Sequence, residues 1–264
     1  MSPHTAPSTE RAAPSTRAAL ESLLRSRQLD RTLTTAIPAP SVRDDAVVAA
    51  TGIGPLDARL EGGFPRGQLS ELVGPRSSGR TSLMLQTLAA ATARGELVAL
   101  VDALDMLDVD SASAAGIDLA RLLWVRGHVV PNPGLCRDMN QRALEQAIRA
   151  LALVLQAGNF GTVVFDVAEA PPEAIRRLPF TTWLRLQRMV EGGQTACVLV
   201  GAEPMARSTA GLTVKLGIRD WGLGIRFEHR LFDGLNLEAR VIRARARSCE
   251  DATLALTTVA THCA

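Results

Sequence analysis

Residues 69–81 read LSELVGPRSSGRT. The stretch begins with a short apolar segment typical of a buried strand, passes through a loop bounded by two glycines, and leads into a Leu- and Ala-rich run that predicts a helix. The loop matches the phosphate-binding pattern G-x-x-x-x-G-K-[ST] except at Arg80, which stands where the pattern has lysine. In a strand–loop–helix unit of this kind, successive backbone N–H groups and the amino end of the helix hold phosphate oxygens.

The arginine at this position affects what the loop can do. Lysine is a compact point charge, whereas arginine is a wider planar fork that does not fill the same space. We therefore expect the geometry for catalysis to suffer more than the affinity for phosphate. For ATP and magnesium we expect weak binding or none. The alternative is a glycine-rich turn without a ligand. The predicted nucleotide-binding residues are Gly74, Ser77, Ser78, Gly79, Arg80 and Thr81.

A second carboxylate belongs at the end of a neighbouring strand, where it would hold the water shell of Mg²⁺. Asp166 follows the apolar run 162–165 and is well placed for this role. A carboxylate that caps the following turn is the other interpretation. The sequence leaves both open.

Beyond the loop, strand-like and helix-like segments alternate. Nearly continuous apolar runs at 69–73, 97–101, 162–165 and 197–200 predict buried strands, and periodic segments at 81–94, 144–155 and 182–191 predict helices. Such alternation is typical of an α/β fold, in which helices flank a largely parallel central sheet. Short β-like runs between glycines over 212–247 predict an antiparallel C-terminal extension.

We expect four segments along the chain: a disordered tail (1–14), an N-terminal helix and linker (15–50), the core domain (51–247) and a C-terminal tail (248–264). The predicted N-terminal helix carries an apolar stripe formed by Leu20, Leu23 and Leu24. This stripe either packs on the core or docks on another protein.

Composition excludes several classes of protein. The chain has 264 residues with 29 basic and 27 acidic side chains, and the net charge of +2 excludes a polycationic nucleic-acid coat but allows a local basic face. Aromatic residues make up 3% with no tyrosine, which argues against a stacking platform for single strands. The four cysteines are widely spaced and fit neither a zinc site nor a disulfide framework. No apolar run is long enough for a membrane helix, and we expect a cytoplasmic protein.

Several motifs follow one another in the order and near the spacing found in the RecA recombinase ATPase core, which the chain resembles over roughly residues 15–245. The resemblance implies a RecA-like P-loop core. The matching segments are 51–57 (TGIGPLD), 62–67 (GGFPRG), 71–81 (ELVGPRSSGRT), 101–108 (VDALDMLD), 115–118 (AGID) and 122–123 (LL).

The departures from RecA concern catalysis and DNA binding. RecA uses a glutamate to activate the attacking water, and the matching residue here is Leu104, which cannot accept a proton. Asp105 is adjacent, but in a strand its side chain would point to the other face. The glutamine that senses the γ-phosphate in RecA would fall near residues 202–203 and is absent. The segments that match the two DNA-binding loops, about 168–180 and 204–211, are short.

Two groups of arginines form candidate basic faces. Arg243, Arg245 and Arg247 alternate with alanines, so on a strand they would share one face. Arg176 and Arg177 lie in the segment that matches the first DNA-binding loop of RecA. The functional interpretation is salt-dependent contact with the DNA backbone. The alternative is a solvated edge strand that charge protects from aggregation.

A shortened RecA-like chain with an impaired loop also resembles the ImuA-type accessory proteins of translesion DNA synthesis, and the segment GGFPRGQLSEL (62–72) fits that family as well as it fits RecA. This resemblance implies DNA-damage tolerance and mutagenesis under SOS-type induction. The implied partners are RecA, an inactive Y-family polymerase-like protein and an error-prone C-family polymerase. Such a chain would act as an adaptor without catalytic residues, and it would limit RecA filaments.

Two other functions remain open on the sequence. One is a DNA-stimulated ATPase of recombinational repair, in which Asp105 or Asp102 would replace the missing glutamate. The other is a RecA-fold regulator of a different process such as cell division.

Overall fold

Strand β3 (Leu69–Val73) lies near the middle of an eight-stranded sheet in the computed structural model, which describes residues 47–127, 137–218, 236–245 and 253–257. The strand order is β10-β9-β8-β3-β7-β6-β4-β5. Neighbours from β8 to β5 run parallel, whereas β9 and β10 join antiparallel beyond β8, so the predicted α/β class with its antiparallel C-terminal extension is confirmed. The remaining strands are β4 (Val98–Asp102), β5 (Leu122–Arg126), β6 (Thr162–Asp166), β7 (Ala196–Gly201), β8 (Ala210–Ile218), β9 (Asn236–Ala244) and β10 (Thr253–Thr257).

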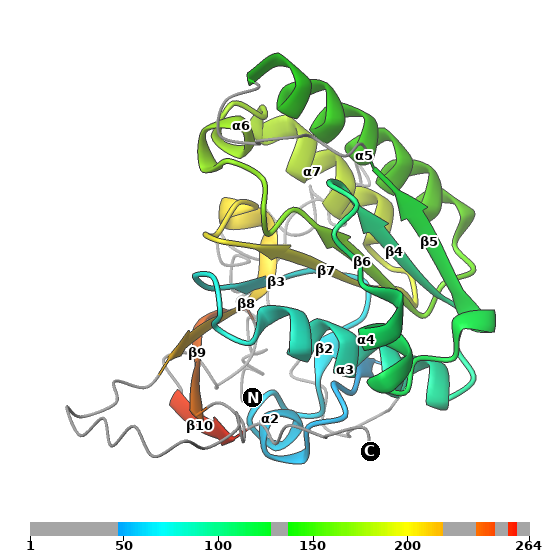
Figure 1. Cartoon of the computed structure of the whole chain (residues 1–264), viewed down its shortest axis with the longest axis vertical. Coiled ribbons are helices and arrows are strands. Elements are labelled where there is room, and N and C mark those ends of the chain that lie inside the picture. The colour runs from blue at the N-terminus through cyan, green and yellow to red at the C-terminus, as the bar shows by residue number, and fades with distance from the viewer. Residues whose placement is uncertain (1–46, 128–136, 219–235, 246–252, 258–264) are drawn as a thin grey trace, which may run out of the picture. The chain divides into compact units, whose positions relative to one another are not determined.

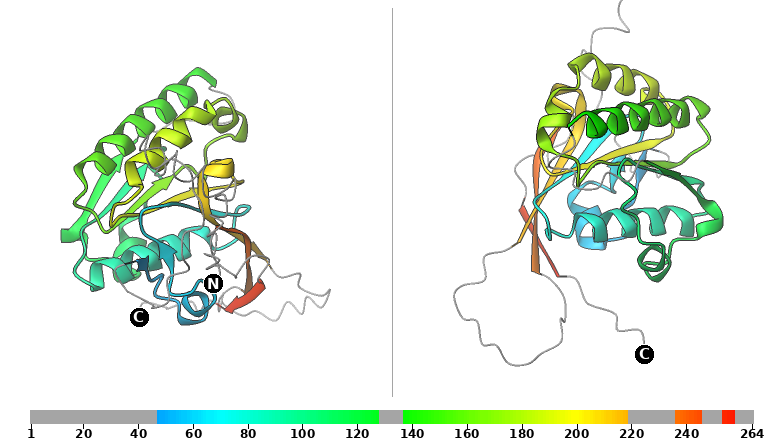
Figure 2. Two further views of the ribbon diagram at one scale, coloured as in Figure 1. Left: turned by 180° about the vertical axis from the view of Figure 1, so that it is seen from behind. Right: turned by 45° about the horizontal axis from the view of Figure 1, so that its top comes forward.

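Helices cover both faces of this sheet (Figure 1). One face packs against α2 (Gly54–Arg59), α3 (Arg80–Ala93) and α4 (Val109–Ala114). The other packs against α5 (Arg137–Ala157), α6 (Pro172–Arg176) and α7 (Phe180–Val190). Figure 2 shows the same two layers from behind and from a tilted direction.

Each central strand contributes to two separate cores. In β4, Val98 and Leu100 join the cluster under α3, while Ala99 and Val101 join the cluster under α5. Side chains of a strand alternate between faces, so a strand covered on both sides must be apolar throughout. This is why the predicted strands read as continuous apolar runs.

The predicted helices at 81–94, 144–155 and 182–191 correspond to α3, α5 and α7. Two strands differ from the prediction. The sequence analysis assigned no strand to β5, and β10 lies in the segment expected to be a tail, where it pairs with β9 and carries the sheet past residue 247. The tail 1–14, the helix with Leu20, Leu23 and Leu24, and Arg247 lie outside the described residues.

Arg66 connects several chain segments at the amino ends of the parallel strands. It follows the short antiparallel pair β1 (Val48–Ala49) and β2 (Phe64–Pro65). Its guanidinium donates to the carbonyl oxygens of Val48, Gly161 and Gln194 at 2.9–3.1 Å and pairs with Glu96 at 2.7 Å. The polar loops at the opposite edge are therefore attached to a sheet that is already fixed at its base.

No helix in the described ranges is long and apolar enough to cross a membrane.

Candidate phosphate-loop site

The loop between β3 and α3 has the backbone form that a phosphate cradle needs. Ser77 and Gly79 adopt left-handed conformations, with φ of 61° and 84°, and Gly79 directly precedes the first residue of α3. A Cβ on Gly79 would overlap the side chain of Leu237, and one on Gly74 would lie 2.5 Å from the carbonyl oxygen of Leu216. Gly74 is therefore required by its close approach to the backbone of β8, and Gly79 by its left-handed conformation.

Ser78 supplies an unused polar atom inside this loop. Its side chain is 1% exposed, and its Oγ has no hydrogen-bond partner among the described residues. A buried hydroxyl without a partner is costly unless a ligand or water satisfies it. The cradle therefore fits a group that carries hydrogen-bond acceptors, as phosphate oxygens do.

The Arg80 side chain contacts the segment that follows β6. Its Nη1 lies 3.4 Å from the carbonyl oxygen of Ala168, and its Nη2 lies 3.5 Å from Glu169 Oε1. Burial lowers the pKa of the Arg80 guanidinium, while the charges of Glu169 and Asp166 raise it. Glu169 also pairs with Arg76, at 2.5 Å. The charge that should meet phosphate is thus already paired within the protein.

Asp166 ends β6 beside Asp102 at the end of β4, and the two residues are register partners. Burial raises the pKa of Asp166 to about 6; the Asp102 charge adds to this rise, whereas the N–H of Ala168 and the Arg80 charge oppose it. Asp166 Oδ1 accepts the Ala168 N–H at 2.9 Å, which is the turn-capping contact that the sequence left open.

The structure gives little support for a metal held by protein side chains alone. Within the described ranges, no three His, Cys, Asp or Glu side chains lie together as a metal cluster would require. Magnesium usually keeps several waters and binds one or two carboxylates together with phosphate oxygens. Asp166 therefore remains a candidate only for this mixed kind of site.

Asp102 and Asp105, the two candidates to replace the missing general base, both accept hydrogen bonds from other groups of the protein. Asp102 Oδ2 accepts the Leu107 N–H at 2.8 Å and the Trp124 indole N–H at 3.3 Å. The two carboxylate oxygens of Asp105 accept from Nε and Nη2 of Arg126 at 2.8 and 2.7 Å, and this contact holds the pKa of Asp105 below its ordinary value. The expectation that Asp105 lies in a strand is wrong, because β4 ends at residue 102 and Asp105 is left-handed, with φ 58°. Leu104 is buried at 5% exposure.

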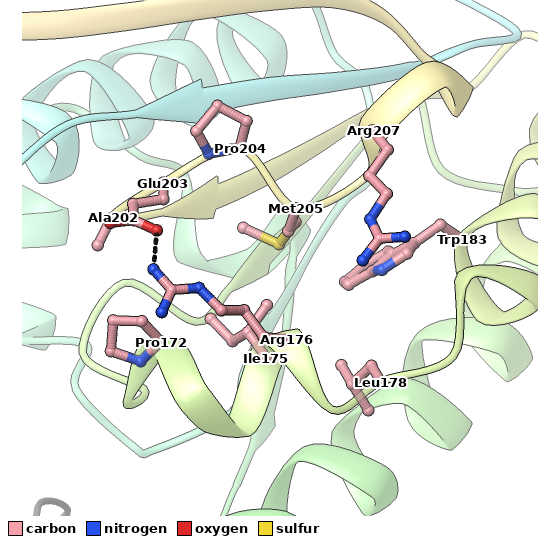
Figure 3. A pocket seen from close by; sticks show the side chains of 10 residues that line it. All are labelled: Pro172, Ile175, Arg176, Leu178, Trp183, Ala202, Glu203, Pro204, Met205 and Arg207. Atoms are coloured by element: carbon pink, nitrogen blue, oxygen red, sulfur yellow. Dashed lines mark hydrogen bonds and ion pairs between the residues drawn. The ribbon is translucent and has the colours of Figure 1, made fainter.

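The two segments expected from the sequence to replace the DNA-binding loops face each other across a pocket of about 60 Å³ (Figure 3). Arg176 of α6 pairs with Glu203 of the β7–β8 loop at 2.7 Å and bridges them. Trp183 and Met205 line the apolar part, and Arg207 lies next to Trp183 in the view of Figure 3. The loops are therefore joined to each other.

Glu71 holds the β7–β8 loop in place, a role that was not predicted from the sequence. Its Oε1 accepts the N–H groups of Met205 and Ala206 and its Oε2 accepts the Thr213 hydroxyl, each at 2.7 Å. The side chain is 1% exposed. An acidic residue in the middle of the apolar run LSELV is the signal that could have identified it.

Two of the candidate DNA-binding arginines, Arg176 and Arg245, contact the same β7–β8 loop. Arg176 is paired with Glu203, as described, while Arg177 is exposed. Arg245 donates to the carbonyl oxygen of Ser208. Ala244 is buried between the half-buried Arg243 and the exposed Arg245, and β9 ends at Ala244. The shared face predicted for these arginines stays a prediction.

Comparisons with known proteins agree with this geometry. The family model described as the RecA N-terminal domain matches residues 38–171. Protein RecA of Acholeplasma laidlawii is 36% identical over 140 residues, which cover 53% of this chain and 35% of that protein. Protein RecA of Bordetella pertussis (strain Tohama I) is 37% identical over 135 residues, covering 50% and 34%. The match thus spans about a third of the length of these relatives.

A solved structure shares the fold. The crystal structure of the RadB recombinase superposes with a TM-score of 0.55 at 20% identity, covering 79% of this chain and 94% of that one. The family model includes β3, the phosphate loop, α3, β4 and β6, and it extends over just over half of the 264 residues. The chain therefore belongs to the RecA family.

Proposed function

We propose that this chain is a RecA-family accessory protein of DNA-damage tolerance, which binds other proteins and does not act as a motor. The observation that carries the proposal is the ion pair of Arg80 with Glu169, in which the Arg80 side chain is 6% exposed. The position that matches the RecA glutamate holds the buried Leu104. A RecA fold that keeps its scaffold without these two parts is suited to docking.

Nucleotide binding by this chain would be weak. The backbone of the loop, Ser78 and Thr81 would hold the phosphates, and Asp166 would hold the water shell of magnesium. ATP, when bound, supplies a phosphoryl group that can be transferred to water. The residues described here do not accelerate that transfer, because Leu104 cannot accept a proton and Asp105 is held as an ion by Arg126.

The partners we propose are RecA and the translesion polymerases, with DNA as a further ligand of the arginines around the β7–β8 loop. The relatives named above are RecA proteins and RadB is a recombinase, which supports a role in DNA transactions. A chain that docks on RecA without completing an ATP site would end filament growth and favour lesion bypass over strand exchange.

We expect ATP turnover by the purified full chain, with or without single-stranded DNA, to stay about 100-fold or more below that of a RecA control, since losing general-base help typically costs that factor. Arg80→Lys should not restore it, because Leu104 remains. Steady-state phosphate release measures this. Brisk turnover that Asp166→Ala abolishes would instead establish the ATPase of recombinational repair.

The adaptor role has its own test. At equimolar ratio the chain should shorten RecA filaments in electron micrographs and reduce strand exchange. A variant with serine at Leu20, Leu23 and Leu24 should lose the effect. Leu153→Ser is the matched control, because Leu153 is a leucine of α5 with 68% exposure. Unchanged filament length with the wild-type chain would contradict the proposal.

A further inference from the structure

Two arginines of the phosphate loop converge on one carboxylate. Arg76 lies within the loop and Arg80 begins α3, while Glu169 comes from the segment after β6. Arg76 Nη2 is 2.5 Å from Glu169 Oε2, and Arg80 Nη2 is 3.5 Å from Glu169 Oε1. The two oxygens of Glu169 thus serve different arginines, as a bridging phosphate would.

The three side chains of this contact differ in how far they are buried. Arg80 is 6% exposed and Glu169 is 23% exposed, whereas Arg76 is 83% exposed. A buried guanidinium needs an anion, and arginine pairs with carboxylates and phosphates through the same planar geometry. Glu169 therefore supplies Arg80 with the negative charge that a bound phosphate would bring.

The same carboxylate lies in the wall of a cavity that the two arginines of the phosphate loop also line. A cavity of about 380 Å³ opens there, lined by Arg76, Arg80, Glu169, Pro172, Glu173 and Ala202. A polyphosphate entering it would meet two arginines whose positive charge is partly compensated by Glu169, and a carboxylate of its own sign. Binding thus requires breaking the Glu169 contacts and moving its charge away.

We infer that Glu169 is an internal anion that occupies the arginines of the phosphate loop and competes with polyphosphate for them. The inference rests on the proposed function in one respect, namely that the loop is a weak nucleotide site. It adds the cause of that weakness, which lies in Glu169 as well as in the exchange of lysine for arginine. Removing the negative charge of Glu169 should strengthen binding, although the substitution adds no new contact.

The test uses the purified full chain with Mg-ATP and, separately, inorganic tripolyphosphate, and binding is measured by titration calorimetry. Glu169→Gln keeps the shape and removes the charge, and it should tighten binding of both probes by about tenfold or more, as expected for the loss of a close like charge. Glu173→Gln is the matched control. It removes the same charge from the wall of the same cavity, but no ion pair joins Glu173 to either arginine within the described residues, so binding should change by less than about twofold.

Each outcome decides the inference. Equal affinity of the wild type and Glu169→Gln, or weaker binding by the variant, would overturn it; weaker binding would show that Glu169 helps to hold the ligand. If thermal unfolding shows that the glutamine variant does not fold, Glu169→Ser must tighten binding in its place. Tighter binding accompanied by rapid hydrolysis would support the inference while contradicting the adaptor role. A failed filament test with tighter binding would contradict only the adaptor role.

Discussion

Replacing Glu71 with leucine should lower the free energy of unfolding by about 3–5 kcal/mol, since each buried donor left without an acceptor costs about 1–3 kcal/mol. Glu71 accepts three hydrogen bonds of 2.7 Å, from Met205, Ala206 and Thr213. Leucine fills a similar volume and accepts none of them, and the start of the β7–β8 loop would lose its attachment to β3. Urea unfolding followed by circular dichroism measures the change.

Glu71→Gln is the matched variant. Its side-chain oxygen can still accept the two N–H groups, and its amide can donate to the hydroxyl of Thr213, so we expect a loss of only about 1–2 kcal/mol. Equal losses for leucine and glutamine would show that the negative charge of Glu71 matters and the hydrogen bonds do not. A loss below about 1 kcal/mol for leucine would contradict the anchoring role.

Asp166→Asn should stabilise the protein at pH 7.5 by about 2–3 kcal/mol, because a rise of about two pKa units corresponds to that free energy. Burial raises the pKa of Asp166 from 3.8 to about 6, so the folded protein binds this proton more tightly than the unfolded chain does. The contribution of Asp166 to wild-type stability must therefore fall as the pH rises from about 4 to about 6 and stay constant above that range. Asparagine removes this penalty.

The measurement is the unfolding free energy of wild type and variant between pH 4 and pH 8. The advantage of Asp166→Asn should be small at pH 4 and grow until about pH 6. Asp110→Asn, on the exposed side of α4, is the control and should show no such growth. An advantage independent of pH would mean that proton binding is not its cause. A buried carboxylate kept at such a cost is typical of a ligand site.

Local patterns predicted much of this fold because they reflect local physics. The strands at β3, β4, β6 and β7 are buried on both faces and end at loops, so each gives a continuous apolar run. Strand β5 is only partly buried at the sheet edge, and its short run LLWVR does not distinguish strand from helix. The short helices α2, α4 and α6 span six residues or fewer, which is too little for a helical period to be recognised.

The residues of the candidate site also differ in whether a local sequence pattern could identify them. The two glycines, Ser78 and Arg80 were identifiable because the phosphate loop is one continuous segment. Glu71 and Glu169 acquire their roles from distant partners; Glu71, for example, meets residues 134 and 135 positions away. The raised pKa of Asp166 likewise comes from burial in the folded chain, with the charge of Asp102 on the neighbouring strand adding to it. Tertiary pairing of this kind leaves no local signature in one sequence.

The position of β3 between β7 and β8 has a consequence for how the chain is made. A ribosome releases β3 and the phosphate loop long before either neighbouring strand exists, because both come from the second half of the sequence. During that interval an apolar strand with two unpaired edges is open to aggregation or to a chaperone. Assembly of the cradle is therefore among the last events of biosynthesis, and a nascent chain stalled before β8 would carry the motif without the site.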